Sequence, residues 1–318
     1  MTLDPQVEQF LKQMQSVGNA PLHQLQPSDA RRQFAEGARV LAKTGRSPNL
    51  ERVDDVVCPT RHGSIPIRLY IPKGQGLHPL MVFYHGGGFV LGDIDSYDQL
   101  ASGLAESTKY AVASVDYHLA PEAKFPQAVE ECYDALGWLA SEGPRKWPIS
   151  GHTLVVAGDS AGGNIAAVMA QLSMKHEGPS LAAQILYYPA IDMVTVTDSK
   201  KLFATGLFLE WEDIVWFGEQ YLRTPSDGES PLASPIRSTD LRGLPPALIV
   251  TAEYDPLRDE GELYRDALTE VGVPVRHIRV PGMVHGFLSV PFLRAAHEIL
   301  TATRQFLTDV DVKPTLMS

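Results

Sequence analysis

Apolar residues in this chain fall into two kinds of pattern. Short apolar runs typical of buried strands occur at 53–57, 65–71, 80–84, 110–115, 154–157, 181–188, 247–251 and 274–280. Between several of these runs, apolar residues recur at intervals of three and four, the spacing of an amphipathic helix. This alternation predicts an α/β fold, with a mostly parallel central sheet flanked by helices. No helical pattern separates the first two runs, so we expect an antiparallel pair at that edge.

The first 48 or so residues precede the first strand and have helical patterns of their own. One amphipathic stripe consists of Val7, Phe10, Leu11 and Met14. Pro21 and Pro27 interrupt the pattern, and Ser28 is expected to cap a second helix. Because these helices come before the sheet in the sequence, they must pack on a surface that later residues provide.

A second stretch, residues 192–237, also departs from the alternation. It carries several aromatic residues among charged ones, which predicts an inserted, mainly helical segment. With the N-terminal helices it is expected to form a cap over the carboxyl ends of the strands, where open α/β sheets bind ligands. The alternative is an ordinary helix on a sheet face. The predicted division is N-terminal cap helices 1–48, first core part 49–191, inserted cap segment 192–237 and second core part 238–318.

Composition narrows the class of partner. The chain has 318 residues, 44% hydrophobic and 20% charged, as in a globular protein with a sizeable core. Its formal net charge of −11 disfavours nucleic acid and anionic membranes as partners. Cys58 and Cys132 are expected to be buried free thiols, since their spacing suggests neither a metal site nor a disulfide framework. No signal peptide or membrane-length apolar run is evident, which favours a cytoplasmic location.

The sharpest chemical signal is Gly158-Asp159-Ser160-Ala161-Gly162, which fits G-x-S-x-G. The run before it predicts a strand and the pattern after it predicts a helix, as in a nucleophile elbow. So tight a turn would leave no room for a side chain at Gly158 or Gly162, and it would expose the Ser160 hydroxyl. Free backbone N–H groups at the start of the helix, Ala161 first, would point toward an oxyanion beside Ser160.

A general base and an orienting acid are then sought later in the chain. Of ten histidines, His285 lies in a glycine-flanked loop after a predicted strand, and the order Ser, acid, His suits this fold. His85 precedes the serine, which is the wrong order. For the acid we favour Asp255, whose backbone Pro256 helps to fix. Two further carboxylates in the same stretch, Glu253 and Asp259, remain as alternatives, although Asp259 is expected to start a helix.

A second source of oxyanion donors is the run His85-Gly86-Gly87-Gly88, which follows a predicted strand. Glycines let the backbone approach a reacting carbonyl closely. A bare glycine run can also be a flexible turn. Here it stands where an α/β-hydrolase places the second half of its oxyanion hole.

Four motifs together resemble the hormone-sensitive lipase family of α/β-hydrolases, in particular its bacterial and archaeal carboxylesterases. They are His85-Gly86-Gly87-Gly88-Phe89, Tyr117-His118-Leu119-Ala120-Pro121-Glu122, Gly158-Asp159-Ser160-Ala161-Gly162-Gly163 and Asp255-Pro256-Leu257-Arg258-Asp259. The resemblance covers nearly the whole chain, including the two segments that match the family's cap. One departure is His118, where the family usually has arginine, and it leaves open how this loop is anchored.

The resemblance implies a serine esterase that needs neither a cofactor nor a metal. The family's triad falls on Ser160, Asp255 and His285, and its oxyanion donors on Gly87, Gly88 and Ala161. Members often dimerise through the last strand of the sheet, so a homodimer is also an expectation.

The function that we predict is hydrolysis of small-molecule carboxylic esters with short or medium acyl chains, because a cap limits the pocket. Four apolar residues are expected to contact the substrate: Phe89, Tyr188, Phe208 and Leu209. An amidase, lactonase or deacetylase on the same machinery is one alternative. A non-catalytic ligand-binding member of the fold is another, and the presence of His285 argues against it.

Overall fold

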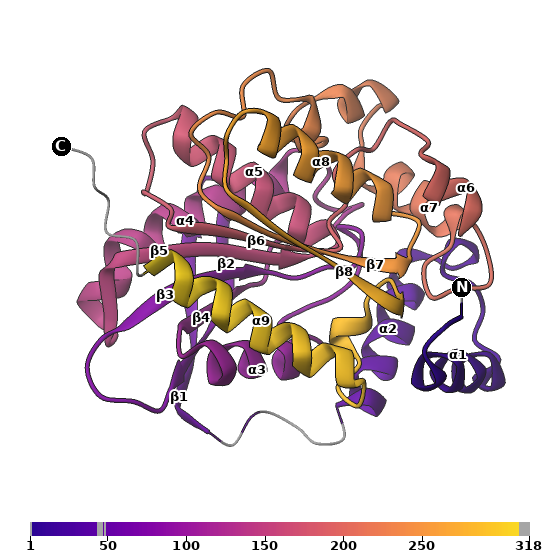
Figure 1. The fold of residues 1–318 in the computed structure, drawn as a ribbon, viewed down its shortest axis with the longest axis horizontal. Helices are drawn as coiled ribbons and strands as arrows, with labels where there is room; N and C mark the ends of the chain where they lie inside the picture. The colour runs from indigo at the N-terminus through magenta and orange to yellow at the C-terminus, as the bar shows by residue number, and fades with distance from the viewer. Residues whose placement is uncertain (1, 43–46, 48, 312–318) are drawn as a thin grey trace.

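The computed structural model describes residues 2–42, 47 and 49–311, and an eight-stranded sheet forms its centre (Figure 1). The order across the sheet is β1-β2-β4-β3-β5-β6-β7-β8. The strands are β1 Leu50–Thr60, β2 Gly63–Pro72, β3 His78–Tyr84, β4 Ala111–Val115, β5 Ile149–Asp159, β6 Ala183–Tyr187, β7 Ala247–Tyr254 and β8 Val275–Val284. Strand β2 pairs antiparallel with both β1 and β4, and the remaining pairs are parallel. The predicted α/β fold and antiparallel edge are therefore confirmed.

Helices cover both faces of the sheet. Figure 1 shows α4, α5 and α8 on one face and α3 and α9 on the other. The helices are α1 Pro5–Val17, α2 Pro27–Leu41, α3 Asp98–Thr108, α4 Gln127–Lys146, α5 Ala161–Lys175, α6 Asp198–Leu202, α7 Trp211–Tyr221, α8 Arg258–Glu270 and α9 Arg294–Asp311. Short 3₁₀ turns occur at η1 Leu22–Gln24, η2 Pro225–Glu229, η3 Pro235–Arg237 and η4 Phe287–Ser289.

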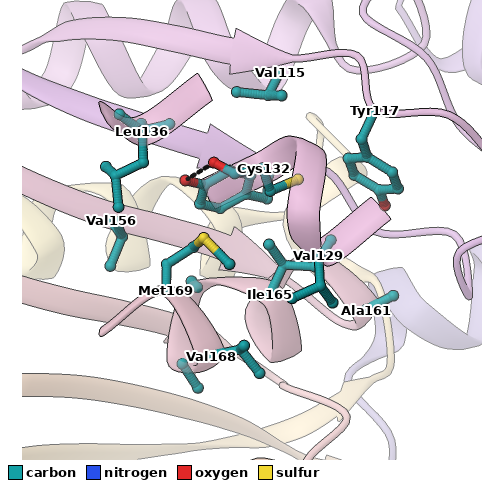
Figure 2. Close-up of a cluster of buried hydrophobic side chains, with 14 of the residues drawn as sticks. Val115, Tyr117, Val129, Cys132, Leu136, Val156, Ala161, Ile165, Val168 and Met169 are labelled. Carbon is teal, nitrogen blue, oxygen red and sulfur yellow. Dashed lines mark hydrogen bonds between the residues drawn. The ribbon is translucent and has the colours of Figure 1, made fainter. Parts of the chain in front are cut away.

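The core on the α4/α5 face holds the central strand β5 against its helices. In Figure 2, Val156 of β5 lies near Leu136 and Cys132 of α4, and near Ile165 and Met169 of α5. All five side chains are buried, and burying an aliphatic side chain of this size contributes roughly 1.5–3 kcal/mol. Because β5 and α5 meet at Ser160, this packing fixes the strand and the helix that flank the predicted elbow. Cys58 and Cys132 are both buried and free, as predicted.

Some predicted boundaries need correction. Ser28 does not cap the second helix: α2 begins at Pro27 with Gln26 as its N-cap, because proline suits the first helical position and moves the start before Ser28. Strand β8 continues past residue 280 to Val284. Residues 43–46 and 48 of the predicted N-terminal segment lie outside the described residues.

The N-terminal helices and the segment 192–237 meet at one end of the sheet. Figure 1 shows α1, α2, α6 and α7 at the end to which the parallel strands point. The Asp4 N–H donates to Gly282 O of β8 over 3.1 Å, and the Phe10 and Phe208 ring centroids are 5.8 Å apart. Among the described residues no helix combines the length and apolar character needed to cross a membrane.

Candidate active site

Ser160 lies between the end of β5 and the start of α5, in a backbone conformation with φ 54° and ψ −119°. The left-handed φ is unusual for a residue with a side chain and marks a strained turn. A Cβ on Gly158 would lie 2.1 Å from Gly162 O, and one on Gly162 would lie 1.9 Å from Tyr84 O. The collision predicted for both glycines is therefore present, and the chain can turn here only with glycine at these two positions.

The structure brings Ser160, His285 and Asp255 together in one row. Nε2 of His285 lies 2.9 Å from Ser160 Oγ, and its Nδ1 lies 2.8 Å from Asp255 Oδ2. The three residues follow β5, β8 and β7, and the carboxyl ends of these strands share one edge of the sheet. Asp255 is fully buried, and its other oxygen accepts the Leu257 N–H over 2.8 Å. Both oxygens thus have donors, which holds the carboxylate toward the imidazole.

The two alternative carboxylates are engaged elsewhere. Glu253 accepts the Gly282 N–H over 2.8 Å, and it thereby holds the strand that leads to His285. Asp259 lies in the first turn of α8, as predicted, where it accepts the Ser199 N–H over 2.7 Å. Of the three carboxylates, Asp255 is therefore the one that the structure places on His285.

The glycine loop follows β3 and lies beside the elbow. Gly87 and Gly88 have φ values of 106° and 62°. A Cβ on Gly87 would lie 2.3 Å from Leu91 O, so the loop has no space for a side chain there. Within residues 2–42, 47 and 49–311, neither N–H of these two glycines donates a hydrogen bond. Ala161, the first residue of α5, directly follows Ser160, and the first N–H groups of a helix have no partner within it.

Asp159 connects this loop to the elbow, a role that the motif search missed. It occupies the variable position of G-x-S-x-G, and its Oδ1 accepts the Gly86 N–H over 2.8 Å. Tyr97 OH donates to Oδ2 over 3.3 Å. Burial raises the pKa of Asp159 to about 7, although both hydrogen bonds oppose that shift. The only sequence signal was an acidic residue next to the nucleophile.

His85, the histidine set aside for its chain order, has a different environment from His285. It is completely buried and its ring stacks on Tyr117 at a centroid distance of 4.4 Å. Burial lowers the pKa of His85 to about 4, so the ring is neutral at physiological pH. Its Nδ1 lies 2.8 Å from Gly86 O, which places it as a support of the glycine loop.

Of the four residues predicted to contact substrate, Tyr188, Phe208 and Phe89 have contacts that place them beside His285 or the glycine loop. Tyr188 packs its ring edge-on against His285 at 4.9 Å. Phe208 covers Gly286, where an added Cβ would lie 2.9 Å from the ring. Phe89 stacks on Tyr221 at 3.9 Å, and Leu209 is buried.

Phe217 of α7 was not among the predicted residues, although it lies directly on the glycine loop. A Cβ on Gly88 would lie 2.3 Å from the Phe217 ring. The aromatic content of residues 192–237 predicted only an inserted helical segment, because helical spacing does not say which aromatic side chain faces which loop.

The loop that contains His118 is anchored in two ways. Nδ1 of His118 lies 2.8 Å from Oε1 of the buried Glu131, whose other oxygen accepts the His118 N–H over 3.0 Å. Arg31 of α2 donates to Ala120 O over 2.7 Å and to Val90 O over 2.8 Å. Arg31 therefore ties this loop to the residues that follow the glycine loop.

Among the residues that the structure describes, no group of three or more histidine, cysteine or acidic side chains could hold a metal ion. The site consists of the Ser160 hydroxyl, the His285 imidazole and the Asp255 carboxylate, joined in a row by hydrogen bonds, together with backbone N–H donors. Such an arrangement can form and release a covalent intermediate on Ser160.

Comparison with known proteins gives a consistent picture. The alpha/beta hydrolase fold family matches residues 81–289. The carboxylic ester hydrolase LipN of Mycobacterium tuberculosis is 41% identical over 81% of this chain and 71% of its own. An arylesterase of Saccharolobus solfataricus is 34% identical over 98% and 99% of the two chains. The solved structure of a hyperthermophilic esterase from Pyrobaculum calidifontis superposes with a TM-score of 0.93, at 39% identity over 98% of this chain and all of that one.

Each of these proteins is similar to this chain over most of its length. The family match includes the glycine loop and the elbow, and it extends past His285. On the matched residues and the architecture of the sheet, the chain belongs to the α/β-hydrolase family.

Proposed function

We propose that this protein is a serine carboxylesterase that hydrolyses small-molecule esters with short or medium acyl chains. The observation that carries the proposal is the unbroken row Ser160–His285–Asp255, with contacts of 2.9 and 2.8 Å. In the described part of the chain the N–H groups of Gly87 and Gly88 donate no hydrogen bond, which leaves them available to an oxyanion. The esterase names of the relatives support it. The resemblance of the four motifs supports a narrower assignment, to the hormone-sensitive lipase family, as part of this proposal.

In the proposed reaction, Ser160 Oγ attacks the ester carbonyl while His285 Nε2 takes the hydroxyl proton. The carbonyl electron pair moves to oxygen, and the resulting oxyanion accepts hydrogen bonds from the N–H groups of Gly87, Gly88 and Ala161. When the tetrahedral intermediate collapses, the bond to the alcohol oxygen breaks and His285 returns the proton to that oxygen. Water then repeats the sequence on the acyl-enzyme and releases the acid. Asp255 holds His285 in orientation throughout.

The substrate pocket is proposed to be closed by residues 1–48 and 192–237. Phe208 supports this assignment, since it contacts both Gly286 beside His285 and Phe10 of α1. Phe217 supports it from the other side, over Gly88. An acyl or alcohol tail leaving the carbonyl would meet these rings, which limits its length.

The direct test compares Ser160→Ala with Ser141→Ala, a matched control on α4 whose hydroxyl donates to Trp138 O on the surface. Hydrolysis of p-nitrophenyl butyrate should fall by about 10⁶-fold in the first variant and stay unchanged in the second. A fluorophosphonate should label Ser160 in the unmodified protein. Labelling of another residue, or normal turnover by Ser160→Ala, would refute the mechanism. Ester binding without turnover by the unmodified protein would favour the ligand-binding alternative.

A further inference from the structure

Helix α7 lies directly on the proposed oxyanion loop. Its Phe217 ring occupies the space beside Gly88, and its Tyr221 stacks on Phe89 at 3.9 Å with the rings 5° from parallel. Any movement of α7 would therefore change the space next to Gly88. Besides its buried side chains, contacts at its two ends help to set the position of this helix.

The C-terminal end of α7 is held by a cation. Lys124 Nζ donates to Glu219 O, Gln220 O and Leu222 O over 3.0, 2.7 and 2.9 Å. A positive charge at the last carbonyls also suits the helix dipole. This end is thus tied to the segment 124–125, where the Phe125 N–H also donates to Tyr221 O over 2.9 Å.

The N-terminal end is held by His23 of η1. Its Nδ1 lies 2.9 Å from Asp213 Oδ1, and its Nε2 lies 3.0 Å from Glu212 Oε2. The backbone N–H of His23 also donates to Asp213 Oδ1, over 3.2 Å. His23 therefore joins the N-terminal segment to the first turn of the helix that covers the glycine loop.

The two ring contacts of His23 select one protonation state. Ionised carboxylates accept hydrogen bonds but do not donate them, so both ring nitrogens must carry a proton to make both bonds. Only the imidazolium cation satisfies this condition. Of the two carboxylates, Asp213 is nearly buried and Glu212 is exposed. Glu219, nearly two turns further along α7, lines the same surface groove as His23. The titratable groups that face His23 from α7 are all acidic.

We propose that His23 is a positioning residue whose protonated ring fastens α7 over the glycine loop, so that the choice among esters depends on pH. Loss of one ring proton removes one of the two charge-assisted hydrogen bonds and loosens the first turn of α7. A longer acyl chain then displaces the Phe217 ring more easily. The fastening itself is independent of catalysis, whereas the effect on ester choice rests on the proposed esterase function.

The fastening is tested by amide hydrogen exchange of residues 211–221 without substrate, corrected for the intrinsic effect of pH, between about pH 5 and pH 8. Corrected exchange should rise about tenfold with pH in the unmodified protein. It should be uniformly fast in His23→Gln. In Glu212→Gln it should depend little on pH, because the amide accommodates neutral His23. The control is His62→Gln, which removes a histidine that faces Glu130 of α4 at 2.6 Å. The fastening would be overturned if corrected exchange in the unmodified protein did not change with pH. It would also be overturned if exchange rose equally with pH in the unmodified protein and in His23→Gln.

The effect on ester choice is tested by the ratio of kcat/KM for p-nitrophenyl octanoate and butyrate. Because both esters use the same catalytic groups, protonation of those groups cancels in the ratio. The ratio should rise with pH in the unmodified protein and His62→Gln, and stay high and flat in His23→Gln. A flat ratio alongside pH-dependent exchange would overturn the role in ester choice. Absence of turnover on both esters would instead count against the proposed function, since exchange does not depend on it.

Discussion

The loops that carry Ser160, Asp255 and His285 differ in construction from the covering segments, residues 2–42 and 192–237, which pack at the same end of the sheet. The loops continue directly from parallel strands, and their side chains are positioned by short hydrogen bonds and by glycines that no other residue can replace. The covering segments are held by ring contacts and by a few ties such as Arg31 and His23, and they expose apolar side chains such as Leu202 and Val215. Changes in the loops should therefore reduce turnover of every ester, whereas changes in the cover should alter preference among esters.

The two regions are not independent, because they touch at several places, three of which are glycines. Phe217 lies on Gly88 and Phe208 on Gly286, while Asp4 donates through its N–H to Gly282 O. Removing the first forty residues would therefore disturb the strand that carries His285 as well as the pocket wall. Point variants separate the two regions more cleanly than truncation does.

After the loss of the nucleophile, the largest expected effect distinguishes Asp255 from Glu253. Asp255→Asn keeps the shape of the side chain but loses the charge that stabilises the imidazolium, so kcat should fall about 10⁴-fold. Glu253→Gln, the control, keeps an acceptor for the Gly282 N–H and should cost less than about tenfold. Steady-state kinetics on p-nitrophenyl butyrate decides between them. The reverse order of effects would move the role of orienting acid to Glu253.

Much of the structure of the loops that carry Ser160, Asp255 and His285 could be predicted, because the sequence patterns that indicate it are local. Apolar runs identify the strands, and the glycines around Ser160 indicate a turn that needs them. The choice of Asp255 rests on its position in the loop after a strand, where Pro256 helps to fix its backbone. Ser28 was misplaced as a helix cap because the effect of Pro27 on the start of the helix was not weighed.

The contacts of the cover could not be predicted in the same way. The spacing of apolar residues shows that a helix has a buried side, but it does not identify the surface on which that side packs. Phe217 on Gly88 and Arg31 on Val90 O join residues far apart in the chain. Asp159 was missed for a different reason, since its bond to the Gly86 N–H depends on the relative position of two loops.

The next effect compares one glycine from each region. Gly162→Ala would place a Cβ 1.9 Å from Tyr84 O and 2.7 Å or less from further backbone of the neighbouring strand, which cannot rotate away. The free energy of unfolding should fall by about 3 kcal/mol or more. Gly218→Ala in α7 meets nothing within 4 Å and should raise it by about 0.5–1 kcal/mol. Urea unfolding measures both, and equal responses would contradict the contrast between the two regions.

A third effect concerns the buried charge of Asp159. The folded pKa is about 7, whereas an unfolded aspartate titrates near 4. Between these two pKa values the folded state binds more protons than the unfolded state. The contribution of Asp159 to the free energy of unfolding is therefore fully present below about pH 4 and is lost as pH rises through about 7. The loss amounts to up to about 1.4 kcal/mol per pH unit. Asp159→Asn removes this dependence on pH. Its free energy of unfolding should therefore rise relative to that of the unmodified protein as pH increases to about 7.

The control for Asp159 is Asp240→Asn on the surface, where the hydrogen bond from Arg242 holds the pKa at about 2. Asp240 titrates below about pH 4. Between about pH 4 and 7 the free energy of unfolding of Asp240→Asn should therefore change with pH as it does in the unmodified protein. Urea midpoints across that range measure all three proteins. Identical slopes in Asp159→Asn and the unmodified protein would show that this carboxylate is already ionised throughout.

The smallest expected effect belongs to the cover. Phe208→Ala removes the ring that lies between Gly286 and Phe10, and the space that it leaves should admit bulkier esters. Discrimination should change by about 1–3 kcal/mol per methylene-sized difference in fit, seen as a shift of the optimum in kcat/KM across p-nitrophenyl esters. Leu202→Ala, an exposed apolar residue of α6, is the control and should leave the profile unchanged. Labelling of Ser160 by a small fluorophosphonate should proceed at the same rate in both variants, because the elbow is not touched. A slower labelling rate with an unchanged ester profile would place Phe208 with the catalytic loops and remove it from the pocket wall.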